Sequence, residues 1–276
     1  MSISKREVFT AVLVLAASAT AAIVLPPLLG QVADTSDAVK RIEMQLAASP
    51  LALARARGAV AQRQWALEQI AQPYEIVLAT QSPRWLGAVA MQSPDDAWTI
   101  QEILVETKPD IIIEAGTYRG GMALFMASVL SLINPAGKVI TLDVSPEGAI
   151  DRQAREHRLW SQYVEFIQGD DTAPAIIARL KERTANKKTL VLLDTLHTLA
   201  HTRKELPLYA DLVSVGSYLI MHDTNYSGHP LGPPDGMGPY EAVQEFLKHD
   251  HRFVADRSRE RFIITLMPSG FLKRVK

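Results

Sequence analysis

The chain has 276 residues, with 29 basic and 30 acidic side chains, and its formal charge of -1 gives no basic field that would attract nucleic acid. It contains no cysteine, so disulfides, thiolate zinc sites and thiol nucleophiles are excluded. The length fits a terminal segment followed by one domain of roughly 190–200 residues, which is large enough to bury a single core.

Residues 1–33 predict a membrane anchor. Lys5 and Arg6 precede a stretch from Val8 to Leu29 without a charged side chain, and about 20 apolar residues span a bilayer as a helix. A secretory signal peptide is the competing interpretation. We favour the anchor because the apolar stretch continues past the candidate cleavage site, and we therefore expect a single-pass membrane protein.

Residues 34–83 predict a helical linker next to the membrane. Val39, Ile42 and Leu46 recur at helical spacing, which indicates either a solvated helix or a stalk that pairs with a second copy to give a homo-oligomer. Residues 84–276 then form the predicted folded domain.

Strands and helices alternate through this domain. Buried strands are predicted at 110–114, 138–143, 164–167, 189–194 and 218–221, and helices through 98–104 and at 120–133, 147–158, 174–184, 200–212 and 239–249. Two more strands, near 252–256 and 261–266, lie close enough in sequence to form a hairpin at the sheet edge. The alternation predicts an α/β fold, a Rossmann-like parallel sheet with helices on both faces.

Acidic residues follow four of the predicted strands. Glu114, Asp143, Asp194 and Asp223 fall at carboxyl ends, where open α/β sheets bind their ligands. Four such positions in succession indicate a crevice lined with carboxylates. Asp143 is placed to bind the two hydroxyls of a ribose, which fits a dinucleotide or another adenosine cofactor.

Glycines follow the first strand. Gly116, Gly120 and Gly121, with Thr117 between them, would let the backbone turn sharply and approach a ligand closely. The spacing is not the dinucleotide fingerprint, and a plain strand-to-helix turn is the alternative. Asp170, at the end of the third strand, is placed to lie beside an adenine, with capping of the following helix as an equal alternative.

Two histidines, His197 and His222, accompany the strand-end aspartates, and His222 directly precedes Asp223. Asp194 and Asp223 end neighbouring strands, so their oxygens can converge on a hard cation such as Mg²⁺. His197 lies one turn after Asp194, where it could take a proton from a hydroxyl. A single histidine is more often a solvated or core residue. The role as a proton acceptor is favoured only because the histidine lies near two strand-end aspartates.

Together these motifs resemble the cephalosporin hydroxylase family, which is close to metal-dependent rhamnosyl, other sugar and macrolide O-methyltransferases. The resemblance covers roughly residues 84–274. It rests on Ile113-Glu114-Ala115-Gly116-Thr117 with Gly120-Gly121, Leu193-Asp194-Thr195-Leu196-His197, Asp223-Thr224-Asn225, and Arg259-Glu260-Arg261-Phe262.

The resemblance implies a class I methyltransferase fold that uses S-adenosylmethionine and a divalent metal. It places the cofactor against the segment from Glu114 to Gly121 and against Asp143. It implies metal ligands at Asp194, His222 and Asp223, and a catalytic base at His197. The family usually carries Glu where this chain has His222, which would shift metal preference from Mg²⁺ toward Mn²⁺ or another transition metal.

The expected activity is methyl transfer to a hydroxyl, as on a sugar of a glycolipid, a polysaccharide or a secondary metabolite. Because S-adenosylmethionine is made in the cytoplasm, we expect the catalytic domain on that side of the membrane. The loop 225–238, with His229, is expected to close over the acceptor as a lid. The alternatives are a non-catalytic, membrane-tethered binding protein and a metal-dependent hydroxylase.

Overall fold

The computed structural model describes residues 69, 73, 74, 76–231, 236–262 and 264–276. The chain divides into two units, Met1–Ile70 and Ala71–Lys276, and the fold described below belongs to the second.

The prediction of a single-pass membrane protein is corrected. In the described part of the chain no helix is both long and apolar enough to cross a bilayer. Among the helices described below, the longest, at Pro94–Thr107, has 14 residues, against the roughly 20 that a span requires. The predicted apolar span 8–29 lies outside the described residues. The predicted linker 34–83 also lies outside them up to residue 71, with the exception of residue 69.

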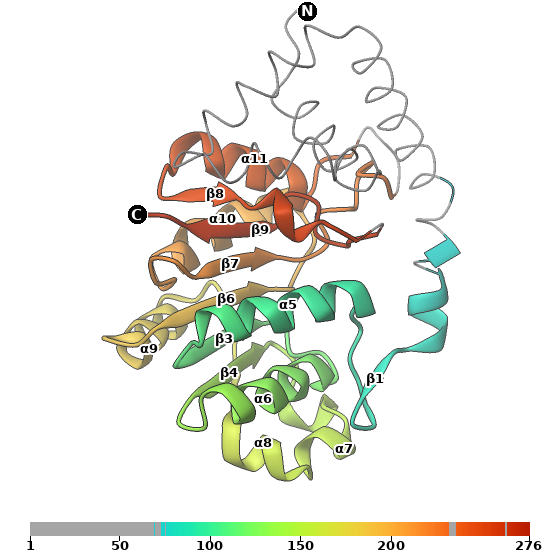
Figure 1. The fold of residues 1–276 in the computed structure, drawn as a ribbon, viewed down its shortest axis with the longest axis vertical. Coiled ribbons are helices and arrows are strands. Elements are labelled where there is room, and N and C mark those ends of the chain that lie inside the picture. The colour runs from blue at the N-terminus through green and yellow to red at the C-terminus, as the bar shows by residue number, and fades with distance from the viewer. Residues whose placement is uncertain (1–68, 70–72, 75, 232–235, 263) are drawn as a thin grey trace, which may run out of the picture. The chain divides into compact units, whose positions relative to one another are not determined.

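A seven-stranded sheet organises the unit (Figure 1). Its order is β5-β4-β3-β6-β7-β9-β8. The strands are β3 (Ile111–Ala115), β4 (Lys138–Asp143), β5 (Val164–Gln168), β6 (Thr189–Leu193), β7 (Tyr218–Met221), β8 (Phe253–Ala255) and β9 (Phe271–Arg274). The first five are parallel, whereas β9 runs antiparallel to both β7 and β8.

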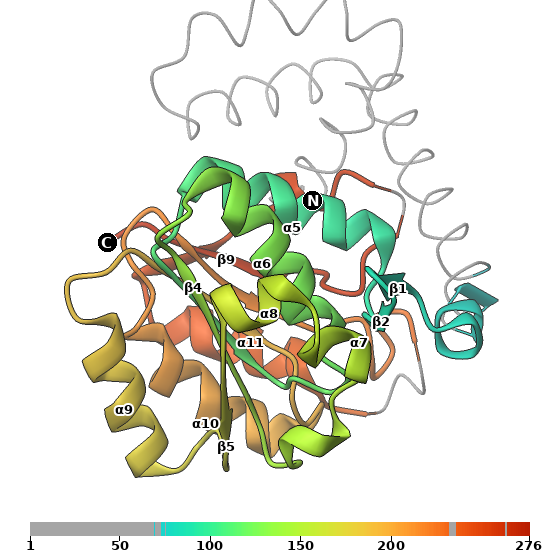
Figure 2. The ribbon, with the colours of Figure 1, turned by 90° about the horizontal axis from the view of Figure 1, so that it is seen from below.

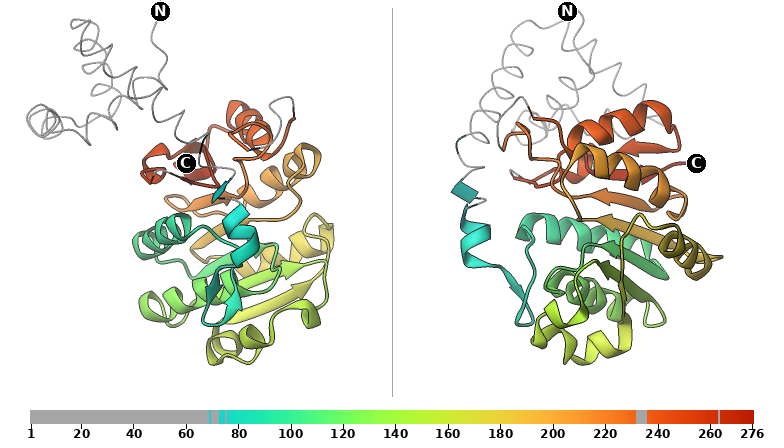
Figure 3. Two further views of the ribbon diagram at one scale, coloured as in Figure 1. Left: turned by 90° about the vertical axis from the view of Figure 1, so that its right-hand side faces the viewer. Right: turned by 180° about the vertical axis from the view of Figure 1, so that it is seen from behind.

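Helices cover both faces of the sheet, as predicted (Figures 2 and 3). One face packs against α5 (Pro94–Thr107), α6 (Gly121–Ile133) and α8 (Arg158–Tyr163), and the other against α9 (Pro174–Thr184), α10 (Leu199–Ala210) and α11 (Pro239–His249). Each face buries its own apolar cluster. Because both faces are covered, the central strands are mostly apolar, and every residue of β6 is buried.

The helix predicted at 147–158 is divided. It consists of a 3-10 turn η1 (Glu147–Ala149), a short helix α7 (Arg152–Arg155) and α8, with His157 capping α8 through its side chain. A second 3-10 turn, η2 (Arg257–Arg259), follows β8.

The strand predicted at 261–266 is wrong, because the antiparallel partner of β8 is β9 at Phe271–Arg274. Leu266 lies in the connection instead, where its backbone N–H donates to the buried Asp96 carboxylate at 2.7 Å. Thr265 donates its hydroxyl to the same carboxylate at 2.6 Å. The N-cap position of α5 is held by Ser93.

A small two-stranded sheet precedes α5. It pairs β1 (Arg84–Trp85) with β2 (Ala88–Val89) in antiparallel fashion. In the large sheet, β4 and β6 lie on opposite sides of β3, so the strand order reverses there. A crevice for ligands is expected outside the carboxyl ends of the strands at such a point.

Candidate active site

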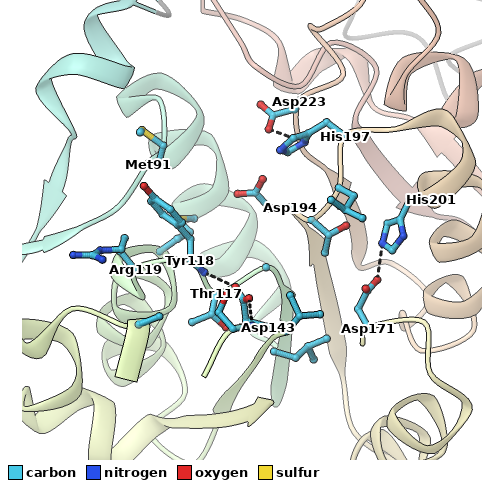
Figure 4. Close-up of a pocket in the computed structure, with 18 of the residues that line it drawn as sticks. Met91, Thr117, Tyr118, Arg119, Asp143, Asp171, Asp194, His197, His201 and Asp223 are labelled. Atoms are coloured by element: carbon cyan, nitrogen blue, oxygen red, sulfur yellow. Dashed lines mark hydrogen bonds and ion pairs between the residues drawn. The ribbon is translucent and has the colours of Figure 1, made fainter. Parts of the chain in front are cut away.

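A pocket of about 920 Å³ opens at this position (Figure 4). Its wall comes from the loops that follow β3, β4, β5 and β6, together with Asp223 and Tyr226 after β7. Residues ahead of the main sheet also line it, including Leu78, Val89 and Met91. Their contribution was not predicted, because no motif marks this apolar segment.

The glycines after β3 are required by the packing of the protein itself. A Cβ added to Gly116, whose φ is +97°, would lie 1.8 Å from the carbonyl oxygen of Asp194. One added to Gly121 would lie 2.2 Å from the carbonyl oxygen of Val89. Gly116 and Gly121 line the pocket, whereas Gly120, packed against Ile150, is not part of its lining.

Glu114 does not line the pocket. Its side chain is buried and accepts a hydrogen bond from the Thr141 hydroxyl. Burial raises the pKa of Glu114 to about 8, and the nearby carboxylates of Asp194 and Asp143 add to the rise. The hydroxyls of Thr141 and Thr117 lie 2.6 Å apart, so Glu114 reaches the pocket only through this chain of hydroxyls.

Asp143 and Asp170 both line the pocket. The Asp143 carboxylate accepts hydrogen bonds from the backbone N–H groups of Tyr118 at 2.9 Å and Ser145 at 2.8 Å, which hold it at the end of β4. Asp170 accepts from the backbone N–H and the hydroxyl of Thr172, both at 2.8 Å. It therefore stabilises the turn ahead of α9, and its adenine role stays a prediction.

Asp194, His197 and Asp223 converge on the opposite side of the pocket (Figure 4). Each offers one ligand atom, and the three atoms lie within 4.8 Å of one another. His197 Nδ1 is 3.0 Å from Asp223 Oδ2. The protein around Asp194 desolvates its carboxylate and raises the pKa, although 28% of the side chain remains exposed.

His222 lies behind this group. Its ring is buried, and Nδ1 is 3.8 Å from Asp194 Oδ2. Burial lowers the pKa of His222 to about 4, so the imidazole is neutral. The convergent set therefore contains His197, whereas the ligand set expected from the resemblance contains His222.

His229 contacts helix α11 and is not among the residues that line the pocket. Its Nε2 is 2.6 Å from Glu241 Oε1, and its ring stacks on Tyr240 with centroids 3.9 Å apart. The expected contact of His229 with the acceptor stays a prediction. The lid role of 225–238 stays a prediction, since residues 232–235 are not described.

The strand order and the pocket at its reversal define a Rossmann-like methyltransferase domain. Two solved structures of CmcI share this fold. The apo form has a TM-score of 0.54 at 19% identity, covering 70% of this chain and 76% of that chain. The form with Mg and SAM has a TM-score of 0.55 at 19% identity, covering 70% and 77%.

Sequence comparison identifies the family. The model of the rhamnosyl O-methyltransferase/CmcI family matches residues 78–275. The rhamnosyl O-methyltransferase of Mycobacterium leprae (strain TN) is 36% identical over 195 residues, covering 69% of this chain and 82% of that protein. The one from Mycobacterium tuberculosis (strain ATCC 25618 / H37Rv) is 37% identical over 196 residues, covering 69% and 77%.

The chain belongs to the rhamnosyl O-methyltransferase/CmcI family, which confirms the predicted resemblance. It is an S-adenosylmethionine-dependent O-methyltransferase. This activity was preferred over a non-catalytic binding protein and a hydroxylase on sequence grounds, and the comparisons favour it.

Proposed function

We propose that the protein transfers a methyl group to a sugar hydroxyl with the help of a divalent cation. The observation that carries the proposal is the convergence of Asp194, His197 and Asp223 within 4.8 Å, beside a pocket suited to the cofactor. The sugar acceptor is inferred from the relatives, which are named rhamnosyl O-methyltransferases.

The pocket fits S-adenosylmethionine in size and lining. Its volume of about 920 Å³ lies within the range of roughly 300–1,000 Å³ typical of cofactor sites. Asp143 would accept hydrogen bonds from the ribose hydroxyls, and Gly116 and Thr117 would bring their backbone against the cofactor. When bound, the cofactor supplies an activated methyl group on a positively charged sulfur.

Oxygen ligands from two strand ends would hold the cation. Asp194 and Asp223 supply carboxylates, the donors that Mg²⁺ and Mn²⁺ prefer. We propose the neutral imidazole of His222 as a third donor, because its Nδ1 lies 3.8 Å from Asp194 Oδ2. A cation here would lower the pKa of an acceptor hydroxyl and orient it.

His197 is the proposed general base. A hydrogen bond from Nδ1–H to Asp223, 3.0 Å away, would fix the tautomer that leaves the lone pair on Nε2. His197 then takes the proton of the acceptor hydroxyl while the oxygen bonds to the methyl carbon. The products would be a methyl ether and the neutral thioether that remains when the bonding electron pair of the transferred methyl group stays on sulfur.

The test measures cofactor binding, metal binding and methyl transfer on the full chain. Methyl transfer from S-adenosylmethionine to a rhamnosyl glycoside is expected to require Mg²⁺ or Mn²⁺ and to stop with a chelator. His197→Ala should lower kcat at least about 100-fold while leaving metal affinity unchanged. His251→Ala, exposed after α11 and not among the pocket residues, is the matched control.

Loss of metal binding in His197→Ala would instead make His197 a ligand and overturn its role as base. Full activity in the presence of chelator would overturn the proposed metal dependence while leaving methyl transfer intact.

A further inference from the structure

A second group of potential ligands lies on the far side of the β6–α10 loop from the first. Asp171, His201 and Glu205 each offer one ligand atom, and the three atoms lie within 4.8 Å of one another. His201 and Glu205 are four residues apart on α10, so they share one face of the helix. Asp171 reaches them from the end of β5, as Figure 4 shows for its contact with His201.

The distances suit a common cation. His201 Nε2 is 3.1 Å from Asp171 Oδ2 and 3.7 Å from Glu205 Oε1. Ligands at about 2.1 Å from a metal, at angles of roughly 90–120°, are separated by about 3.0–3.6 Å. Asp171 and His201 line the pocket, so a cation could reach them from solvent.

Glu205 supplies the independent observation. Its side chain is 0% exposed, and Oε1 accepts a hydrogen bond from the Thr195 hydroxyl at 2.7 Å. The other oxygen, Oε2, is buried without a hydrogen-bond partner among the described residues. Leaving such an oxygen unpartnered costs free energy, because burial removes it from water.

The charges of the group are unbalanced. In the described part of the chain, the only cationic side chain paired with either carboxylate is His201. One imidazolium could neutralise one carboxylate; burial and the neighbouring Asp171 carboxylate raise the pKa of the second, Glu205, which therefore tends to keep a proton when no cation is bound. A divalent cation would neutralise both and would give Oε2 a partner.

We propose that Asp171, His201 and Glu205 form a second divalent-cation site, separate from the one proposed at the catalytic centre. One imidazole with two carboxylates suits a first-row cation such as Mn²⁺ or Zn²⁺. Because Thr195 binds Glu205 and directly follows Asp194, an ion here would stiffen the loop that carries the catalytic groups.

The experiment counts Mn²⁺ on the full-length, chelator-treated protein by calorimetry and by electron paramagnetic resonance of the free ion. The wild type is expected to bind two ions per chain if the catalytic cation is present as well. Glu205→Gln should lose one ion, with affinity at that site lowered at least about tenfold. Asp223→Asn should lose only the other.

Two further variants keep the test decisive. Asp171→Asn removes a ligand near the pocket surface and serves if Glu205→Gln fails to fold. Asp170→Asn changes the neighbouring aspartate, whose carboxylate accepts hydrogen bonds from Thr172, and should keep the metal count.

The outcomes separate the two sites. One ion that is lost in Glu205→Gln and kept in Asp223→Asn supports the second site even if the catalytic centre binds none. An unchanged Mn²⁺ count and affinity in both Glu205→Gln and Asp171→Asn would overturn the proposal and would leave an imidazolium ion pair as the role of this group.

Discussion

Replacing Gly116 by alanine tests how closely the cofactor loop packs against the metal-binding loop. The added Cβ would lie 1.8 Å from the carbonyl oxygen of Asp194 and 2.6 Å from its carbonyl carbon. Both are backbone atoms, so rotation of a side chain cannot relieve the contact. The residue also has a φ of +97°, a conformation that disfavours any side chain.

The size of the effect follows from the geometry. Real Cβ contacts stay beyond 3.0 Å, so Asp194 and Gly116 must separate by at least 3.0 − 1.8 = 1.2 Å. The positive φ costs about 1–2 kcal/mol, and forced overpacking costs about 1–3 kcal/mol more. We therefore expect a loss of roughly 2–5 kcal/mol in unfolding free energy. A misplacement of about 1 Å in an active site can also lower kcat roughly 100-fold.

Two other glycines separate these contributions. Gly216 has a φ of +82° with nothing within 4 Å of an added Cβ, so Gly216→Ala measures the backbone cost alone. Gly148 has open space and no positive φ, and Gly148→Ala should change stability by less than about 0.5 kcal/mol.

Urea unfolding and methyl-transfer kinetics on the three variants provide the assay. Equal destabilisation of Gly116→Ala and Gly216→Ala, with wild-type kcat in both, would refute the close approach of the two loops.

Three further predictions concern Asp96, the cofactor carboxylates and His222. Burial raises the pKa of Asp96 from 3.8 to about 7, so the folded state binds the proton more tightly than the unfolded state. The free energy of unfolding therefore falls as the pH rises from about 4 to about 7. Relative to Asp96→Asn, the wild type should lose on the order of 2 kcal/mol between pH 5 and pH 8 in urea titrations, and parallel pH profiles would contradict this. Asp143→Ala should weaken S-adenosylmethionine binding at least about tenfold by calorimetry, and Glu114→Gln less than about threefold, because only Asp143 lines the pocket. An equal loss would place Glu114 against the cofactor. His222→Glu should tighten Mg²⁺ binding about tenfold, because hard cations prefer oxygen, and unchanged affinity would count against His222 as a ligand.

The sequence predicted most of the sheet because its strands and helices carry strong local signals. The bounds of β4, β7, α9 and α11 are those expected from apolar runs and from proline at the helix starts. The segment 261–266 looked equally suited to a strand, with alternating and β-branched residues. Instead, the backbone N–H of Leu266 bonds to Asp96, 170 residues earlier in the chain. No local pattern reveals such a distant partner.

The site was predicted in position more than in detail. The rule that ligands bind at the ends of parallel strands brought Asp143, Asp194 and Asp223 to one pocket, as the structure shows. The same rule did not distinguish Glu114 from these three aspartates. The side chain of Glu114 points into the protein, because successive residues of a strand alternate between faces. Asp171 could not be linked to α10 from sequence, since it comes from a different strand end.

The loop after β6 connects the separate parts of the site. The carbonyl of Asp194 packs against Gly116 in the cofactor loop, whereas its carboxylate faces the proposed catalytic cation. Thr195 bonds to Glu205 in the second group, and His197 pairs with Asp223 from β7. Since three residues within the stretch 194–197 make all these contacts, a shift of this loop would displace the base and the metal ligand together. We therefore expect changes at Gly116 and at Glu205 to affect catalysis through the same backbone, although neither residue needs to touch the acceptor.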